Sequence, residues 1–326
     1  MTKTVLVTGG AGFIGAHACK MLARSGFTPV VYDDLSTGHQ EFVRWGPLVN
    51  GDIRDQRRLE AAIRAYKPEI VMHFAAKSLV GESMSNPDLY KDVNVGGTTA
   101  LLNAMRRNGC NSLVMSSSAA VYGDASESPL SESAPVSPIN PYGETKARAE
   151  EIAFSTAGVR TIALRYFNAA GADSEGEIWE DHDPETHLIP LVLDAAAGDR
   201  PEIRIFGRDY PTPDGTAIRD YVHVTDIAAA HVLAARALSD GMSSRALNLG
   251  SGRGTSVQEI ICAARRVTGR DIPTEDVSRR AGDPAILTAD AARAQEALGW
   301  RPTRSTIERI LANAWSVHPG RLGRAA

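Results

Sequence analysis

The chain of 326 residues contains only three cysteines, and they stand far apart. Cys19, Cys110 and Cys262 match neither a metal-binding spacing nor a disulfide framework. We therefore expect buried, reduced thiols, and we predict no metal site.

The sequence also lacks a long apolar run and a strong charge bias. No uninterrupted hydrophobic stretch approaches the roughly 20 residues that cross a bilayer, and the N-terminus lacks the charged and apolar regions of a signal peptide. Its 35 basic and 39 acidic side chains give a net charge of −4, which argues against a general nucleic-acid binder. These absences predict a cytoplasmic protein with neither a membrane nor a nucleic-acid partner.

What the chain does have is 43% hydrophobic residues, enough for a sizeable core, and a length that suggests about two domains. From residue 4 to residue 166, short β-branched runs alternate with longer amphipathic runs. This alternation predicts an α/β fold with a doubly wound, Rossmann-like parallel sheet. The expected strands are Thr4–Val7, Thr28–Tyr32, Leu48–Asn50, Ile70–Phe74, Ser112–Met115 and Thr161–Arg165; the expected helices are Phe13–Ser25, Arg57–Tyr66, Asp88–Arg107 and Pro141–Thr156.

The pattern loosens after residue 168. Residues 173–186 are acidic and rich in turn formers, so we expect a surface loop there. The remaining elements predict the end of the large sheet and a smaller C-terminal domain. We expect helices near Leu188–Ala197, Val224–Leu238 and Val257–Thr268, strands near Arg204–Phe206 and Leu247–Leu249, and further helical segments at the C-terminus.

Three glycines mark the turn after the first expected strand. Gly9, Gly12 and Gly15 allow a tight turn, let backbone approach a pyrophosphate, and aim the amides of the following helix at its charge. Asp33 follows the second expected strand, where a carboxylate can bind the adenosine ribose and repel a 2′-phosphate. The order of strand, glycine turn, helix, strand and aspartate predicts that the chain binds NAD rather than NADP. The alternative is that Asp33 and Asp34 only cap a turn.

A tyrosine and a lysine stand one helical turn apart further along. Asn140 is the expected N-cap and Pro141 the first helical residue, so Tyr142 and Lys146 lie on one face of the helix. The lysine ammonium and a positive nicotinamide together would favour the phenolate and make Tyr142 a usable base. The pair alone is weak evidence, since any helix can show it.

Three serines follow an expected strand at the carboxyl edge of the sheet, where ligands bind in such folds. Ser118 can hydrogen-bond a substrate oxygen and relay its proton to Tyr142. The alternative is that Ser116, Ser117 and Ser118 only cap and turn the chain.

These motifs resemble the extended short-chain dehydrogenase/reductase family, along nearly the whole chain, and within it the enzymes that invert C4 of UDP-sugars. The resemblance implies interconversion of UDP-glucose and UDP-galactose through a 4-keto intermediate, with NAD regenerated in each turnover. The stretches that carry it are Val5–Gly15, His73–Ala76, Val80–Ser83, Asn140–Lys146, Arg165–Ala172 and Phe206–Val224.

The resemblance also implies residue roles. Tyr142 would be the catalytic base, Lys146 would bind the nicotinamide ribose and tune Tyr142, and Ser118 would assist at the sugar 4-hydroxyl. Arg219 and Arg280 would hold the diphosphate by charge-assisted bonds. The implied cofactor-binding residues are Gly9, Gly12, Phe13, Ile14, Gly15, Asp33, Asp34, Leu35, Asp52, Ile53, Phe74, Ala75, Ala76, Asn94, Ser116, Tyr142, Lys146 and Phe167. The implied substrate-binding residues are Ser118, Tyr142, Asn168, His187, Leu188, Arg204, Phe206, Arg219, Arg280 and Asp283.

The family further implies an NAD-binding domain of residues 1–168, to which 219–250 contribute, and a nucleotide-sugar-binding domain of 169–218 and 251–326. It also implies a homodimer with a four-helix interface, formed by the helix region of Leu101, Leu102 and Met105 and by the helix of Tyr142. Lys77 stands one place before the cofactor-contacting lysine of some members, so it is given no role. For His187 helix capping remains the alternative to a ligand contact, and for Arg280 a solvated surface pair with Arg279.

The preferred sugar stays open because Leu287 stands where some members have a pocket tyrosine. The alternatives are a UDP-arabinose/UDP-xylose epimerase and a dual-specificity UDP-hexose/UDP-N-acetylhexosamine epimerase. A 4,6-dehydratase is disfavoured because Ala119 and Ala120 replace an Asp–Glu pair. A non-catalytic NAD-sensing regulator is the remaining alternative, against which the presence of Tyr142, Lys146 and Ser118 argues.

Overall fold

The computed structural model describes residues 3–124, 128–280 and 283–322. Its centre is a seven-stranded parallel sheet in the order β10-β6-β5-β4-β1-β2-β3. The chain leaves β1 in one direction and β4 in the other, which puts a topological switch point at their carboxyl ends. The strands are β1 (Thr4–Thr8), β2 (Thr28–Asp33), β3 (Leu48–Asn50), β4 (Ile70–His73), β5 (Ser112–Ser118), β6 (Arg160–Tyr166) and β10 (Arg245–Leu249).

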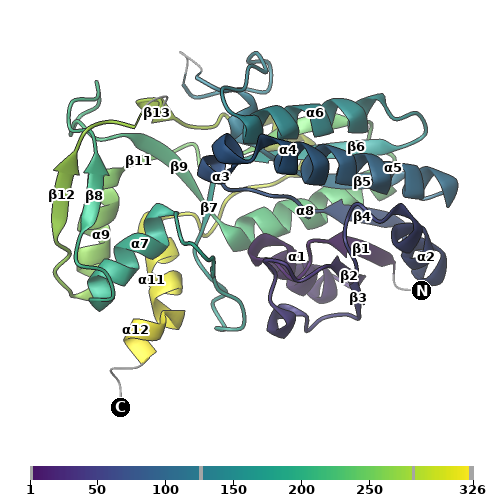
Figure 1. Cartoon of the computed structure of the whole chain (residues 1–326), viewed down its shortest axis with the longest axis horizontal. Coiled ribbons are helices and arrows are strands. Elements are labelled where there is room, and N and C mark those ends of the chain that lie inside the picture. Colours follow the sequence, from purple (N-terminus) through teal and green to yellow (C-terminus); the bar gives the residue numbers. More distant parts are fainter. Residues whose placement is uncertain (1–2, 125–127, 281–282, 323–326) are drawn as a thin grey trace.

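Helices cover both faces of this sheet (Figure 1). Val5 and Val7 of β1 pack in the hydrophobic cluster of one face, with α1 and α8, whereas Leu6 packs in the other, with α2, α5 and α6. Successive side chains of a strand point to opposite faces, so one apolar run serves two cores. These helices are α1 (Phe13–Arg24), α2 (Gln56–Tyr66), α5 (Gly97–Arg107), α6 (Pro141–Ser155) and α8 (Val224–Ser239).

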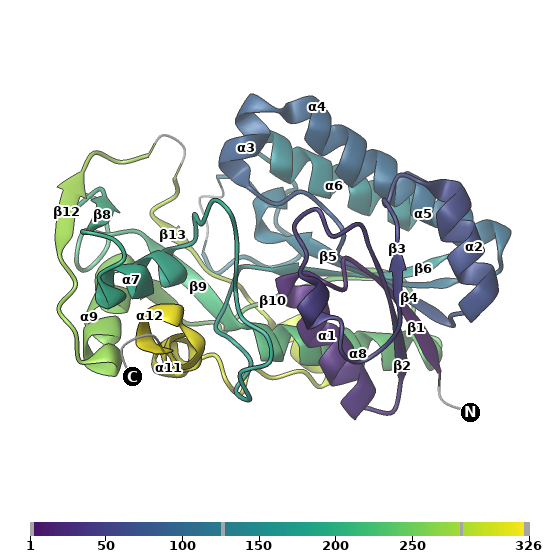
Figure 2. The same cartoon turned by 60° about the horizontal axis from the view of Figure 1, so that its bottom comes forward.

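A smaller part lies beside the large sheet (Figures 1 and 2). Strand β9 pairs with β7, β11 and β13, and β8 pairs with β12. A separate hydrophobic cluster joins α7, α9 and α11 beneath these strands. The elements are β7 (Asn168–Ala170), β8 (Ile203–Phe206), β9 (Ile218–His223), β11 (Gly254–Ser256), β12 (Thr274–Val277), β13 (Ile286–Leu287), α7 (Leu188–Ala197), α9 (Val257–Thr268), α11 (Ile307–Val317) and α12 (Pro319–Leu322). Helix α10 (Ala292–Leu298) instead packs on β10 and α8 of the large sheet.

The structure confirms the predicted fold class and the predicted strands and helices of the large sheet, with ends that differ by a few residues. Strand β5 runs on to Ser118 and so carries all three serines. The expected helix 88–107 is divided into α4 (Pro87–Tyr90), the π-helical turn η2 (Lys91–Gly96) and α5, and it is preceded by a short helix α3 (Val80–Ser85) that the sequence did not indicate. Within the described part of the chain, the 3₁₀ turns η1 (Gln40–Phe42) and η3 (Ala119–Val121) complete the elements.

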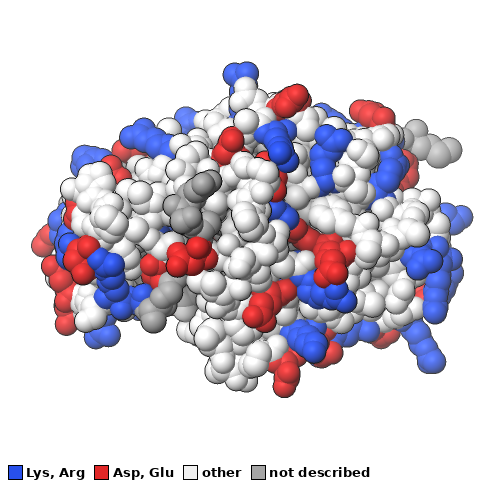
Figure 3. Space-filling view, turned by 90° about the horizontal axis from the view of Figure 1, so that it is seen from above, with Lys and Arg blue, Asp and Glu red and all other residues white. Residues whose placement is uncertain are grey.

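The described residues show neither a membrane-spanning helix nor, on the face in view (Figure 3), a patch of one charge. Among the described residues no helix combines the length and hydropathy needed to span a membrane. On the face shown in Figure 3, basic and acidic side chains are interspersed. The three cysteines are free, and Cys19 and Cys110 are buried as expected, whereas Cys262 is only partly buried.

Candidate active site

The turn between β1 and α1 is shaped by its glycines. Gly9 has a φ of +72°, and a Cβ there would lie 2.5 Å from the backbone nitrogen of Ala75. A Cβ at Gly15 would lie 2.1 Å from the Gly9 carbonyl oxygen, whereas one at Gly12 would lie an ordinary 3.5 Å from the same oxygen. Helix α1, which starts at Phe13 and Ile14, has no side-chain cap at its N-terminus. The turn therefore offers free amides at the carboxyl edge of β1, which suits a diphosphate.

Asp33 ends β2 and is only 8% exposed. Its two carboxylate oxygens accept hydrogen bonds from the amides of Ala11, at 3.0 Å, and Leu35, at 2.9 Å. Burial raises the pKa of this carboxyl group, and the two bonds oppose the rise. Asp34 is exposed and accepts a bond from the Ser36 amide. Both aspartates thus cap turns, and the contact of Asp33 with a ribose stays a prediction.

The chain leaves β4 directly beside the glycine turn. The amides of Phe74 and Ala75 both donate to the carbonyl oxygen of Thr8, at 2.8 and 3.1 Å. Phe74, Ala75 and Ala76 are all partly exposed there. They form the wall opposite Gly9, as a dinucleotide site at the switch point requires.

Asn94 lies in the π-helical turn η2 and is 2% exposed. Its side-chain oxygen accepts from the Lys77 amide at 2.8 Å, and its side-chain nitrogen donates to the Lys77 carbonyl and to the Thr145 hydroxyl, both at 3.0 Å. The three bonds tie the segment after β4 to α6. Asn94 is thus a link between two walls of the site, and its contact with a cofactor stays a prediction.

Helix α6 begins as the sequence predicts. The Asn140 side chain accepts a 2.9 Å hydrogen bond from the Gly143 amide, and Pro141 is the first helical residue. Tyr142 and Lys146 share one face, with the Lys146 ammonium 5.9 Å from the centre of the Tyr142 ring.

Burial dominates the electrostatics of this pair. Lys146 is 6% exposed, and burial lowers its pKa to about 8 although Glu150 opposes the shift. Burial likewise raises the pKa of Tyr142, against a hydrogen bond with Ser118 that lowers it. Among the chain's own groups the phenol pKa is therefore not lowered. The lowering predicted from the sequence also depends on the positive nicotinamide.

The serines at the end of β5 have three different environments. The Ser116 hydroxyl is bonded to the Tyr166 hydroxyl, and the Ser117 hydroxyl donates to the Glu150 carboxylate. Ser118 is partly exposed and its hydroxyl accepts from the Ala120 amide at 3.1 Å, which caps η3. Ser118 therefore caps a turn and also reaches Tyr142, so both of its predicted roles are compatible.

Two arginines of the smaller part lie near the predicted substrate residues. The Arg280 guanidinium carbon stands 3.8 Å from the ring centre of Phe206, so Arg280 is stacked as well as exposed. Arg219 is 15% exposed, donates to the Pro284 carbonyl at 2.8 Å, and lies 3.8 Å from an Asp283 carboxylate oxygen. A planar cation held by stacking or by carbonyl bonds keeps other N–H groups available to an anion.

The other predicted substrate residues are more dispersed. Arg204 is exposed on β8 and pairs with Glu275 of β12 at 3.0 Å, and Asn168 opens β7. His187 occupies the N-cap position of α7, but its side chain makes no capping bond, so the helix-capping alternative is wrong. Leu188 follows as the first residue of α7. Contacts of these residues with a nucleotide-sugar stay predictions.

The remaining cofactor candidates are packed or paired. The Asp52 carboxylate accepts from Arg54 at 2.9 Å, which lowers the pKa of the Asp52 carboxyl group. Ile53 is 5% exposed in the core under α5. Phe167 and Leu287 both pack against the small hydrophobic cluster of Val121, Tyr122 and Leu130.

One residue of this region was missed by sequence reasoning. His231 of α8 places its ring 4.5 Å from that of Phe74 and 6.0 Å from that of Tyr166, centre to centre. Its Nδ1 is bonded to the Ile227 carbonyl oxygen, and burial lowers its pKa to about 4. The contact comes from the docking of α8 on the sheet, which no local pattern indicates.

A glycine turn at the switch point of a doubly wound sheet, with a Tyr–Lys pair and a strand-end serine beside it, defines a site of the short-chain dehydrogenase/reductase type. The model of the NAD dependent epimerase/dehydratase family matches residues 5–250. The chain belongs to this family, which confirms the resemblance seen in the sequence.

Individual relatives match nearly the whole length of the chain. The chain is 49% identical over 319 residues to the UDP-glucose 4-epimerase of Rhizobium leguminosarum bv. trifolii, covering 97% of each chain. It is similar to the crystal structure of UDP-glucose 4-epimerase from Brucella ovis in complex with NAD, with a TM-score of 0.95, 51% identity and 97% and 98% of the two chains covered. A UDP-glucose-4-epimerase structure from Stenotrophomonas maltophila, with bound NAD and formylated UDP-arabinopyranose, matches with a TM-score of 0.95, 41% identity and 99% and 100% coverage.

Proposed function

We propose that this chain is an NAD-dependent UDP-sugar 4-epimerase that interconverts UDP-glucose and UDP-galactose through a 4-keto intermediate. The observation that carries the proposal is the placement of Tyr142, Lys146 and Ser118 on α6 and β5, at the carboxyl edge of the sheet that also holds the glycine turn. The similarity to UDP-glucose 4-epimerases over 97% of the chain supports the same activity.

We expect NAD to bind at the same carboxyl edge of the sheet. The free amides of α1 and the cradle of Gly9, Gly12 and Gly15 fit a diphosphate, and Asp33 disfavours an added phosphate on the ribose. When bound, NAD would supply the acceptor, and then the donor, of the hydride that is exchanged at C4 of the sugar. We assign residues 1–168 and 219–250 to this binding role and residues 169–218 and 251–326 to the nucleotide-sugar.

The chain's own groups handle the proton. Tyr142 removes the proton of the 4-hydroxyl at its phenolate oxygen and returns it when the ketone is reduced. Ser118 shares a hydrogen bond with Tyr142 and guides that proton, while the Lys146 ammonium stabilises the phenolate charge. The ketone is reduced on its opposite face, which inverts C4.

Inversion requires the sugar to turn while the nucleotide stays bound. Arg219 and Arg280 would hold the diphosphate through charge-assisted bonds, and their fixed positions favour a firm grip on UDP. Loose contacts with the sugar ring then allow rotation. We infer that binding energy comes from UDP and that the hexose contributes little.

We further propose that the protein is a cytoplasmic homodimer. Val80 and Met84 of α3 are 46% and 64% exposed, and Phe154 of α6 is 37% exposed. Helix α6 is one of the helices to which the resemblance assigns the dimer interface, and α3 packs against α6. Sedimentation at several concentrations tests this, with a persistent monomer as the contrary result.

The activity is tested by incubating the purified protein separately with UDP-galactose, UDP-N-acetylgalactosamine and UDP-arabinose, and by measuring product and bound NAD. We expect rapid conversion of UDP-galactose. A protein that holds NAD but converts none of the three would overturn the proposal and favour an NAD-sensing regulator.

A pentose epimerase is the second candidate. Leu287, which packs against the same hydrophobic cluster as Phe167, is smaller than tyrosine and has no hydroxyl, so the choice between a hexose and a pentose stays open. The similarity to a structure that contains formylated UDP-arabinopyranose points the same way. A kcat/KM for UDP-arabinose well above that for UDP-galactose would select this alternative.

A further inference from the structure

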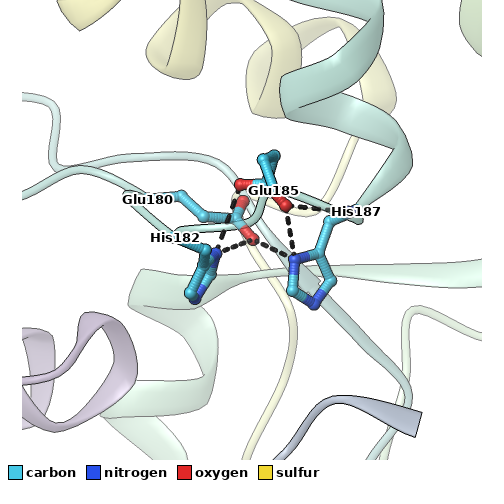
Figure 4. A group of neighbouring side chains, drawn as sticks. All are labelled: Glu180, His182, Glu185 and His187. Atoms are coloured by element: carbon cyan, nitrogen blue, oxygen red, sulfur yellow. Dashed lines mark hydrogen bonds and ion pairs between the residues drawn. The ribbon is translucent and has the colours of Figure 1, made fainter. Parts of the chain in front are cut away.

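The loop between β7 and α7 brings two histidines and two glutamates together (Figure 4). We call Glu180, His182, Glu185 and His187 the His–Glu cluster. Each contributes one ligand-type atom, and these four atoms lie within 4.8 Å of one another. Both imidazole rings turn Nδ1 toward the carboxylates and Nε2 away from them (Figure 4).

The separations within the cluster match those around a small cation. His187 Nδ1 lies 2.8 Å from Glu185 and 3.4 Å from Glu180, and His182 Nδ1 lies 3.2 Å from Glu185 and 3.7 Å from Glu180. Four ligand atoms placed tetrahedrally around zinc at its usual bond lengths stand about 3.4 Å apart. These four nitrogen–oxygen distances fall on both sides of this value, and the remaining two distances are no longer than 4.8 Å, so the side chains would adjust to enclose an ion.

The carboxylate of Glu180 is the group that most needs a partner. Its side chain is 7% exposed. Within residues 3–124, 128–280 and 283–322 it makes no hydrogen bond, and its contacts with charged groups are the two longer ones to His182 and His187. A buried carboxylate without close donors is costly. A cation between it and the two rings removes that cost.

The other carboxylate is already oriented. One oxygen of Glu185 accepts hydrogen bonds from the amides of Thr186 and His187, both at 2.7 Å. Its second oxygen faces His182. Backbone bonds of this kind fix a metal-ligating carboxylate and strengthen its affinity.

We propose that the His–Glu cluster binds a divalent transition-metal ion, preferentially Zn²⁺. Two imidazole nitrogens and two carboxylate oxygens form a borderline ligand set that favours Zn²⁺ over Mg²⁺ and Ca²⁺, which prefer oxygen ligands alone. This proposal departs from the prediction of no metal site, which was based on the spacing of the cysteines.

Two other acidic groups are poorer candidates among the described residues. Asp173, Glu175 and Glu177 surround the ammonium of Lys20, at 2.6, 3.1 and 2.6 Å, so that group already holds a cation. The second contains a single imidazole, that of His318, which is bonded to Asp194 at 3.0 Å. The His–Glu cluster alone of the three has two imidazoles.

The ion would fix a loop that connects both parts of the molecule. Trp179 packs edge-to-face on Phe42, with ring centres 5.0 Å apart, and His39 contacts the Asp181 carbonyl oxygen. At its other end the loop runs into α7 at His187. All four ligands belong to this one loop, so the metal would order it, and any effect on UDP-sugar affinity through His187 rests on the proposed function.

The first test uses the full-length protein after removal of metals with EDTA. Calorimetric titration with ZnCl₂ should show one ion bound per chain through this site, and Co²⁺ should give the intense visible absorption of a four-coordinate ion. Absence of saturable Zn²⁺ binding, or a Co²⁺ spectrum of a fully hydrated ion, would overturn the proposal. Neither measurement involves UDP-sugar or turnover, so failure here leaves the epimerase proposal standing, and the reverse also holds.

Variants then locate the ion. Glu180→Gln and His182→Gln should weaken Zn²⁺ binding by roughly tenfold or more. His39→Gln is the matched control, because it removes an imidazole that touches the same loop without belonging to the cluster, and it should bind Zn²⁺ as the unmodified chain does. Equal affinity in all three variants, or equal loss in all three, would overturn the assignment, and the Co²⁺ spectrum of the unmodified chain decides the matter if a variant does not fold.

Discussion

The ammonium of Lys146 donates a 3.0 Å hydrogen bond to the backbone carbonyl oxygen of Ser116. The bond fastens α6 to the last residues of β5, so the helix face that carries Tyr142 is held against the strand that carries Ser118. Lys146 therefore orients the site in addition to placing positive charge beside the phenol. Because its side chain is 6% exposed, water competes little for either interaction.

Replacement of Tyr142 by phenylalanine separates binding from chemistry. Tyr142→Phe keeps the ring and its packing but removes the hydroxyl that we propose as the acceptor of the substrate proton. We expect NAD and UDP binding to persist while turnover falls by about 10²–10⁴-fold or more. Single-turnover kinetics with UDP-galactose, together with NAD quantitation, measures both.

Tyr90 provides the control for this substitution. Its ring packs edge-to-face against that of Tyr142, with centres 6.5 Å apart, and its hydroxyl donates to the Leu79 carbonyl oxygen. Tyr90→Phe should lose about 1 kcal/mol of stability from that bond and keep most of its turnover. Near-normal turnover in Tyr142→Phe would remove the assigned role.

The glycine turn allows a test of cofactor binding that spares the fold. At Gly12 an added Cβ meets nothing closer than the Gly9 carbonyl oxygen at 3.5 Å, whereas at Gly15 it would collide with that oxygen at 2.1 Å. We expect Gly12→Ala to retain its melting temperature without cofactor and to bind NAD at least tenfold more weakly. Gly15→Ala should be destabilised even without NAD.

Thermal unfolding without added cofactor and titration with NAD distinguish the two variants. The prediction for Gly12 depends on a ligand approaching the turn where the chain itself leaves room. Unchanged NAD affinity in Gly12→Ala would show that the diphosphate is bound elsewhere.

The fold was predictable where local pattern and burial agree. Strands of the central sheet are buried on both faces, so runs such as Thr4–Val7 are continuously apolar or β-branched and easily recognised. Strand β12 (Thr274–Val277) is polar and almost fully exposed. It exists because it pairs with β8, including the contact of Arg204 with Glu275, and pairing between distant segments leaves no local signal.

The same distinction holds for the site. The Tyr142–Lys146 spacing and the Asn140 cap are local, and both are found as predicted. The link from Asn94 to Thr145 and the packing of His231 on Phe74 depend on tertiary contacts, so the sequence could not supply them. The expected surface loop 173–186 is irregular as predicted, yet it buries Glu180, which charge composition alone did not indicate.

A buried ion pair between α6 and β6 should be costly to break. Glu150 and Arg165 are 3% and 5% exposed, and Arg165 donates to both oxygens of Glu150, at 2.9 and 2.5 Å. Glu150→Gln leaves a buried guanidinium charge without its partner. We expect a loss of about 3–5 kcal/mol in the free energy of unfolding, measured by urea denaturation.

The adjacent residue offers the matched control. Glu151 is exposed and pairs with Arg148 at the surface. Glu151→Gln makes the same chemical change in water, where such pairs contribute little, so its cost should stay below about 1 kcal/mol. If the two variants lose equal stability, burial is not what makes the Glu150–Arg165 pair important.

The buried histidines should make the fold sensitive to acid. Burial lowers the pKa of His231 to about 4, and it lowers those of His17 and His73 to about 4 and about 3. In the unfolded chain an imidazole takes up its proton near pH 6.5. Between these values the unfolded state binds more protons, so stability is highest above pH 6.5 and falls as the pH falls, by up to about 1.4 kcal/mol per pH unit for each histidine.

His231→Leu removes one of these contributions while keeping an apolar side chain between Phe74 and Tyr166. Urea unfolding at a series of pH values should give parallel stabilities for variant and unmodified chain above pH 6.5, because His231 is neutral there in both states. Below that pH the variant should lose stability less steeply, by about 1.4 kcal/mol per pH unit, down to about pH 4. Parallel curves through the whole range would mean that His231 takes up its proton without unfolding, and that its environment is more polar than its packing indicates.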